Sequence, residues 1–140
     1  MQDLPAAVGR ALGSPVAAHV RVHGGDVAAA FRMDLADGRR VFAKTHPAAP
    51  PGFFTTEATG LRWLAEPGAV LVPEVLAVSD GDDGGPPLLV LEWIDEGRPT
   101  VGTDAELGRA LADLHRFGMP CFGRPDRRST GSRGLPNEPC

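Results

Sequence analysis

Apolar and polar residues first follow a helical period and then a strand-like alternation over the N-terminal part of the chain. Leu4–Leu12 carries apolar residues at helical spacing, with Asp3 as a candidate N-cap and Gly13 as a stop signal. The period then changes to two, which is typical of strands with one buried face. The predicted strands are His19–Val22, Phe31–Leu35 and Arg40–Lys44, and the last two are joined by a hairpin turn at Asp37-Gly38.

The pattern farther along the chain predicts a crossing helix, two more strands and a final helix. A proline-rich loop at 45–52 comes first. The predicted elements that follow are the helix Thr55–Glu66, the strands Val75–Val78 and Leu88–Leu91, and the helix Asp104–Phe117. Thr103 and Glu106 have the spacing of a capping box, which marks the start of the last helix.

This order of elements predicts an α+β fold, in which a five-stranded antiparallel sheet with one crossing helix is followed by a linker and one more helix. The sequence contains no internal repeat. Its composition shifts after Phe117, because residues 118–140 are rich in glycine and proline. Such a segment has little apolar surface to bury, so we expect it to be irregular and frayed.

The composition is that of a folded, mildly acidic protein. The 140 residues are 42% hydrophobic and 23% charged, and the formal net charge is −4. Nucleic acid and membrane surfaces are therefore not expected partners. The chain has no apolar run of about 18 residues and no signal-peptide pattern, so we expect a cytoplasmic location. Cys121 and Cys140 are expected to be free thiols.

One lysine is distinctive among the basic residues. The sequence contains 13 arginines, and its only lysine is Lys44, at the end of a predicted strand. A lysine ammonium is a compact point charge that suits a narrow slot facing a phosphate, whereas arginine is a wide planar fork. Glu57, near the start of the next predicted helix, could hold the lysine in place. The alternatives are a solvated strand-end lysine and a glutamate that is favoured by the helix dipole.

Two other segments could contact a ligand through backbone groups. Gly24-Gly25-Asp26 lies between the first two predicted strands, where glycines let backbone N–H groups approach a phosphate, although such a pair is also common in hairpin turns. Glu92-Trp93-Ile94 leaves the last predicted strand as an extended segment. Its backbone could pair with an adenine edge, or the segment could be a simple strand exit.

Taken in order, these segments resemble the N-terminal lobe of the protein-kinase-like phosphotransferases, and specifically the fructosamine and ketosamine kinase family. The resemblance covers roughly residues 8–123. The matching segments are Gly24-Gly25-Asp26, Leu35-Ala36-Asp37-Gly38-Arg39, Lys44, Gly60-Leu61-Arg62-Trp63-Leu64, Val72-Pro73-Glu74-Val75, Leu91-Glu92-Trp93-Ile94 and Leu111-Ala112-Asp113-Leu114-His115.

The resemblance implies a kinase-like N-lobe at 1–94, a hinge linker with the first helix of an incomplete C-lobe at 95–117, and a tail at 118–140. It also implies that the glycine loop lies over the phosphates of ATP, that the lysine contacts phosphate and pairs with the glutamate, and that the hinge holds adenine. The cofactor-binding residues implied in this way are Gly24, Gly25, Asp26, Lys44, Glu57, Glu92, Trp93 and Ile94.

The resemblance further implies the activity of an ATP-dependent kinase. Members of the family phosphorylate the O3 hydroxyl of the sugar on glycated amines, with Mg²⁺ and ATP, as a repair step. The implied partners are ATP and a small glycated amine or a glycated protein lysine. The catalytic base and the metal ligands belong to the C-lobe of the family. We therefore expect no catalytic or metal-binding residue in this chain, and negligible kinase activity from the 140 residues alone.

Two alternatives are compatible with the same residues. One is a related small-molecule kinase of the aminoglycoside or choline type, which shares the N-lobe but not the substrate. The other is a non-catalytic role, either as a nucleotide-binding or interaction module or as a vestigial product. The C-lobe would distinguish the first alternative, whereas dependence of ATP binding on Lys44 would separate a real nucleotide site from an inert product.

Overall fold

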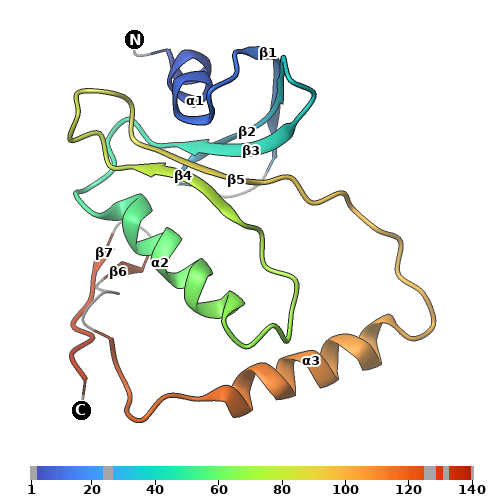
Figure 1. Cartoon of the computed structure of the whole chain (residues 1–140). Coiled ribbons are helices and arrows are strands. Elements are labelled where there is room, and N and C mark those ends of the chain that lie inside the picture. Colours follow the sequence, from blue (N-terminus) through green and yellow to red (C-terminus); the bar gives the residue numbers. More distant parts are fainter. Residues whose placement is uncertain (1–2, 24–26, 125–128, 131–132, 140) are drawn as a thin grey trace.

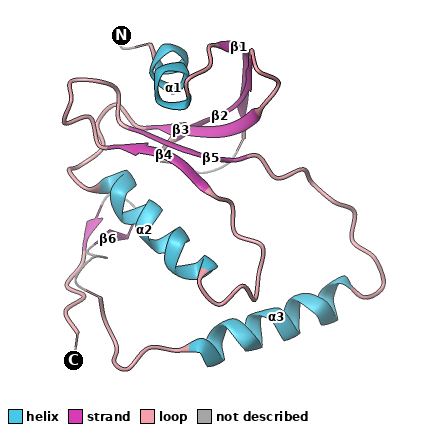
Figure 2. Ribbon diagram, viewed as in Figure 1, coloured by secondary structure: helices cyan, strands magenta, loops and turns pink. Residues whose placement is uncertain are grey.

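The computed structural model describes residues 3–23, 27–124, 129–130 and 133–139. These residues form three helices, a five-stranded sheet and a two-stranded sheet (Figures 1 and 2). The helices are α1 (Leu4–Leu12), α2 (Phe53–Ala65) and α3 (Thr103–Phe117). The strands are β1 (Val16–Val22), β2 (Ala29–Leu35), β3 (Arg40–Thr45), β4 (Val75–Ser79), β5 (Leu88–Glu92), β6 (Ser129–Thr130) and β7 (Arg133–Gly134).

The five-stranded sheet has the strand order β1-β2-β3-β5-β4, and every neighbouring pair is antiparallel. The predicted α+β fold with a five-stranded antiparallel sheet is therefore confirmed. Helix α1 covers one face of the sheet, and α2 lies on the opposite face (Figure 1). Helix α2 packs against β4 and β5, which form one side of the sheet face that it covers. The β1 and β2 side of that face has no helix packed on it in Figure 1.

Alternation along the strands divides the buried residues into two layers. Met33 and Val41 are 0% and 1% exposed and face α1, where they contact a cluster that includes Val8. On the other face, Leu89 packs with Phe54 of α2, and both side chains are completely enclosed. Truncation of an enclosed phenylalanine costs about 3–5 kcal/mol, because it removes burial and leaves a cavity. The two layers therefore hold both helices on the sheet.

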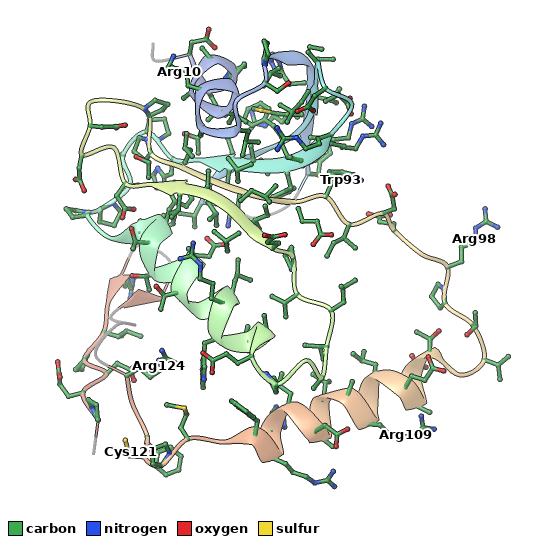
Figure 3. The ribbon with its side chains drawn as sticks, in the orientation of Figure 1. Arg10, Trp93, Arg98, Arg109, Cys121 and Arg124 are labelled. Atoms are coloured by element: carbon green, nitrogen blue, oxygen red, sulfur yellow. The ribbon has the colours of Figure 1, made fainter. Side chains whose placement is uncertain are left out.

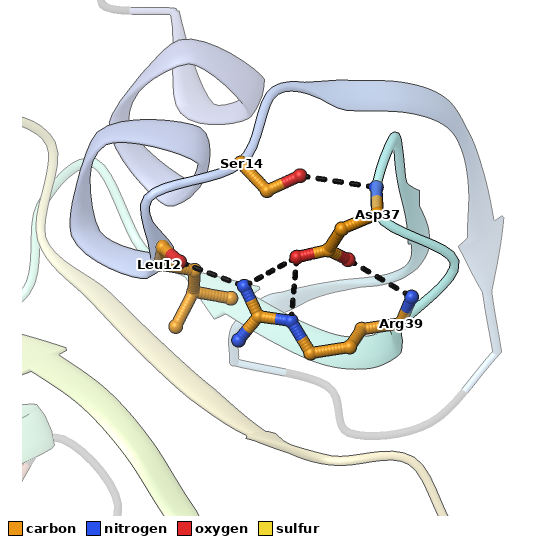
Figure 4. A network of polar contacts seen from close by, with 4 residues as sticks. All are labelled: Leu12, Ser14, Asp37 and Arg39. Carbon is orange, nitrogen blue, oxygen red and sulfur yellow. Dashed lines mark hydrogen bonds and ion pairs between the residues drawn. The ribbon is translucent and has the colours of Figure 1, made fainter.

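A polar network joins the β2–β3 turn to the end of α1 (Figure 4). The Asp37 carboxylate accepts the backbone N–H of Arg39 at 3.0 Å and its Nε at 2.8 Å. Nη2 of Arg39 donates to the Leu12 carbonyl at 2.7 Å, and Ser14 Oγ accepts the N–H of Asp37 at 3.2 Å. Gly38 has φ +89°, which side chains with a Cβ rarely adopt. The predicted turn at Asp37-Gly38 is therefore confirmed.

Helix α3 lies apart from the sheet at the end of an extended linker (Figure 1). The predicted capping box is wrong, because Thr103 Oγ1 accepts the N–H of Thr100 at 2.8 Å and Gly102 is the N-cap, without a side-chain cap. None of the residues of α3 is buried. Leu107 and Leu111 are 53% and 40% exposed, so the helix has an open apolar face. Within the described part of the chain, no helix combines the length and apolar character needed to cross a bilayer.

The segment after α3 contains the two-residue strands β6 and β7, which pair antiparallel within the region predicted to be irregular. The guanidinium of Arg124 lies 4.6 Å from the centre of the Trp63 ring, so this segment contacts α2 (Figure 3). A cavity of about 780 Å³ is lined there by residues of α2, α3 and 118–124. Cys121 is a free thiol, as expected, and Cys140 lies outside the described residues.

Candidate functional site

An ion pair between Lys44 and Glu57 links the sheet to α2. Lys44 Nζ donates to Oε1 of Glu57 at 2.7 Å and to Oε2 at 2.9 Å. The two side chains are 23% and 34% exposed, so solvent screens the pair in part. Such a pair contributes about 1 kcal/mol or less to folding stability. Its main consequence is positional, because it fixes where the ammonium group lies.

The strand around Lys44 is held firmly on both sides. In the sheet register Lys44 is opposite Ala30 of β2 and Leu89 of β5. Both neighbours are almost fully buried, with 2% and 0% exposure. Thr45 Oγ1 donates to the carbonyl of Pro87 at 2.7 Å and fastens the end of β3 to the start of β5. The lysine backbone therefore has little freedom, and the position of its side chain depends mainly on Glu57.

The position of Glu57 depends in turn on a cap that comes from a distant part of the chain. The N-cap residue of α2 is Gly52, which offers no side chain. Asp80, just after β4, accepts the N–H of Phe54 at 2.8 Å and the N–H of Thr55 at 3.4 Å, and its other oxygen accepts the Thr55 hydroxyl. Asp80 therefore satisfies free donors at the helix start, as an N-cap side chain does.

This cap explains why α2 starts at Phe53, two residues before the predicted start at Thr55. The sequence analysis did not single out Asp80, because 26 residues separate it from Phe54. The available signal was indirect. A helix preceded by glycine needs another acceptor for its first N–H groups, and the turn-rich segment 79–87 contains several aspartates.

The predicted hinge residues lie where β5 leaves the sheet. Glu92 is the last residue of β5, and its carboxylate accepts the N–H of Glu74 at 3.2 Å. The Trp93 indole, labelled in Figure 3, donates to Asp95 Oδ1 at 2.9 Å. The Ile94 side chain is 38% exposed. Because Glu92 and Trp93 use their side chains locally, a ligand here would meet this segment mainly through its backbone.

The remaining predicted contacts fall on Gly24, Gly25 and Asp26, which lie outside the described residues. The structure therefore brings Lys44 and Glu57 together and places Glu92, Trp93 and Ile94 at the end of β5. Among the described residues, no group of three or more His, Cys, Asp or Glu side chains is arranged to hold a metal ion.

A second cation lies on the same face of the sheet as Lys44. Arg32 is opposite Phe42 in the β2–β3 register, next to the row that contains Lys44. Its Nη2 is 3.5 Å from Asp34 Oδ2. Asp34 Oδ1 also accepts Nε of Arg40 at 2.6 Å, and this hydrogen bond lowers the pKa of the Asp34 carboxyl below 3.8. Sequence analysis did not single out Arg32, although the alternation of Phe31–Leu35 places it on the face opposite Phe31 and Met33.

Comparisons with known proteins identify relatives over the whole described region. The family model for fructosamine kinase matches residues 2–140. The probable ketoamine kinase of Enterococcus faecium is 36% identical over 104 residues, which are 74% of this chain and 35% of that protein. The chloroplastic protein-ribulosamine 3-kinase of Arabidopsis thaliana is 35% identical over 87 residues, which are 62% of this chain and 26% of that protein.

A solved structure shares the fold. The crystal structure of a Thermobifida fusca protein assigned as a fructosamine-3-kinase aligns with all of this chain at a TM-score of 0.81 and 31% identity, and the match covers 48% of that protein. The chain therefore spans about a third or less of the length of the two curated relatives and about half of the solved structure. The shared architecture is a kinase-like α+β fold.

Proposed function

Because this chain belongs to the fructosamine kinase family, we propose that it forms the ATP-binding part of a kinase that phosphorylates the sugar of ketoamines. The observation that carries the proposal is the ion pair of Lys44 and Glu57, with distances of 2.7 and 2.9 Å, on a sheet face that α2 covers in part. An ammonium held in this way is suited to a phosphate oxygen, because it is compact and its direction is fixed.

The two ends of the proposed site have different chemistry. Lys44 offers a cation to the phosphates, and the backbone of Trp93 and Ile94 offers donors and acceptors to the adenine edge. Lys44 is opposite Leu89, whereas Val41, three residues earlier on β3, is opposite the last residue of β5. Trp93 follows that residue, so the two ends are separated by about 13 Å of extended chain. We assign Gly24, Gly25 and Asp26 to the phosphates as part of the same proposal.

In the proposed reaction, the sugar hydroxyl oxygen forms a bond to the γ-phosphorus of ATP while the bond from that phosphorus to the bridging oxygen of ADP breaks. Lys44 stabilises negative charge on the phosphates, and Glu57 keeps the ammonium in place. A base outside the described residues accepts the proton of the hydroxyl. Asp113 does not suit this role, because it lies on exposed α3 and accepts Nη1 of Arg116 at 2.9 Å.

The substrate class follows from the relatives. Their names specify ketoamines, ribulosamines and fructosamines. We propose that the acceptor is likewise a sugar bound to an amine, either a small glycated amine or a glycated protein lysine. We assign the base and the Mg²⁺ ligands to residues outside the described ones. These 140 residues alone are therefore expected to have negligible kinase activity.

A binding experiment tests the nucleotide site directly. Mg-ATP is titrated into the wild-type chain and into Lys44→Ala, with chemical shifts measured by NMR so that millimolar dissociation constants are accessible. We expect saturable binding that Lys44→Ala weakens about tenfold. Arg109→Ala on α3 removes the same charge far from the site and serves as the matched control. Equal affinities of the wild type and Lys44→Ala, or an equal loss in the control, would contradict the proposal.

A further inference from the structure

Arg32 shares a face of the sheet with Lys44 and lies nearer to the hinge. Side chains on one strand alternate between the two faces, so Arg32 lies on the face of its neighbour Phe42, which packs toward α2. On β1, the residue opposite Arg32 is Val20, which is 53% exposed. This part of the face is therefore open to a ligand.

A nucleotide in the proposed site would have to extend along the sheet past the residues between Lys44 and the hinge. Lys44 is at one end of the path, and Trp93, directly after β5, is at the other. Phe42 lies between them on β3, and Arg32 is its direct neighbour on β2. A ligand that pairs its base with the hinge and places its phosphates at Lys44 therefore passes over Phe42, and Arg32 lies beside this path on the β2 side.

The surroundings of Arg32 determine what it can contact. Its Nε is enclosed without a hydrogen-bond partner, and its side chain is 36% exposed. Nη2 lies 3.5 Å from Asp34, which is farther along β2 and away from Ala30, the residue opposite Lys44. The guanidinium is therefore directed toward the hinge end. Its partner Asp34 is a carboxylate that also binds Arg40, so negative charge stands beside the guanidinium.

We propose that Arg32 packs its guanidinium against the purine base of the nucleotide, an inference that rests on the ATP site proposed above. A planar guanidinium stacks well on an aromatic ring. The Asp34 carboxylate lies at one edge of the guanidinium, whereas an aromatic ring would stack on its planar face. Arg32 then sets the affinity for the base, and Lys44 sets the affinity for the phosphates.

The test compares three probes with the full 140-residue chain: adenosine, ATP and inorganic tripolyphosphate. Each is titrated by NMR into the wild type, Arg32→Leu and Arg32→Gln. We expect both variants to weaken adenosine and ATP by the same factor, about 2- to 30-fold, and to leave tripolyphosphate unchanged. Arg21→Leu is the matched control, because Arg21 is opposite Phe31 and lies on the other face of the sheet. Circular dichroism and thermal unfolding verify that each variant is folded.

The outcomes separate this inference from the function on which it rests. If the wild type binds ATP through Lys44 but both Arg32 variants bind adenosine normally, the stacking role is wrong and the ATP site stands. If the Arg32 variants bind tripolyphosphate as well as ATP more weakly than the wild type does, Arg32 is a phosphate contact and the stacking role is again overturned. If the wild type binds none of the three probes, the proposed ATP site itself fails.

Discussion

Asp80 accepts the backbone N–H of Phe54 at 2.8 Å, so a residue after β4 caps the helix that carries Glu57. This contact connects the turn between β4 and β5 to the Lys44–Glu57 pair. The start of α2 has no cap of its own, because Gly52 lacks a side chain. The geometry of the candidate site therefore depends on a residue outside the Lys44–Glu57 pair.

We predict that Asp80→Ala destabilises the protein by about 0.5–2 kcal/mol, because the first N–H groups of α2 lose their acceptor. Asp80→Asn retains an acceptor oxygen and should lose less. Asp82→Ala is the matched control, since Asp82 is exposed in the same turn. Denaturant unfolding monitored by circular dichroism measures these changes. Equal stabilities of Asp80→Ala and Asp82→Ala would show that the cap does not stabilise α2.

The hydrogen bond from Arg39 lowers the pKa of the Asp37 carboxyl below its ordinary value of 3.8. A carboxyl with a depressed folded-state pKa stabilises the protein above its unfolded pKa, and this contribution is lost as pH falls through the folded pKa. We therefore predict that the unfolding free energy of Asp37→Asn falls less than that of the wild type as pH drops below about 4. Urea unfolding between about pH 2 and pH 7, a range that spans the titration of carboxylates, measures how the unfolding free energy changes with pH. Superimposable pH profiles of the two proteins would rule out the assignment.

The apolar face of α3 is predicted to promote self-association, because Leu107 and Leu111 are 53% and 40% exposed. Replacement of both by glutamine should lower the associated fraction and change the unfolding free energy by about 0.5 kcal/mol or less. Sedimentation velocity at several concentrations measures the association. The control Arg109→Gln changes an exposed polar residue of the same helix. Association that is unchanged by the double replacement would place the contact elsewhere.

The elements that were predicted well are those with strong local patterns. Strict alternation at Phe31–Leu35, together with the glycine turn that leads into Arg40–Lys44, predicts the β2–β3 hairpin from neighbouring residues alone. The scarcity of lysine made Lys44 distinctive, and the next helix supplied one well-placed glutamate. The structure brings these two residues together, while their contact with a nucleotide stays a prediction.

The features that were missed depend on contacts between distant residues or on competition for a side chain. The cap from Asp80 crosses 26 residues, so no periodicity reveals it. The capping box at Thr103 has the right spacing, but the hydroxyl accepts the N–H of Thr100 in the turn before the helix. Arg32 is an ordinary polar position of an alternating strand, and its place beside Phe42 emerges from the register of the sheet.

A double-mutant cycle for Mg-ATP binding measures whether Glu57 acts on the nucleotide through Lys44. The cycle comprises the wild type, Lys44→Ala, Glu57→Gln and the double variant, each titrated with Mg-ATP. We predict that each single change weakens binding by about tenfold and that the double variant binds as Lys44→Ala does, since the glutamate has nothing left to orient. Losses that simply add, or affinities that do not change, would show that Glu57 does not act on the nucleotide through Lys44.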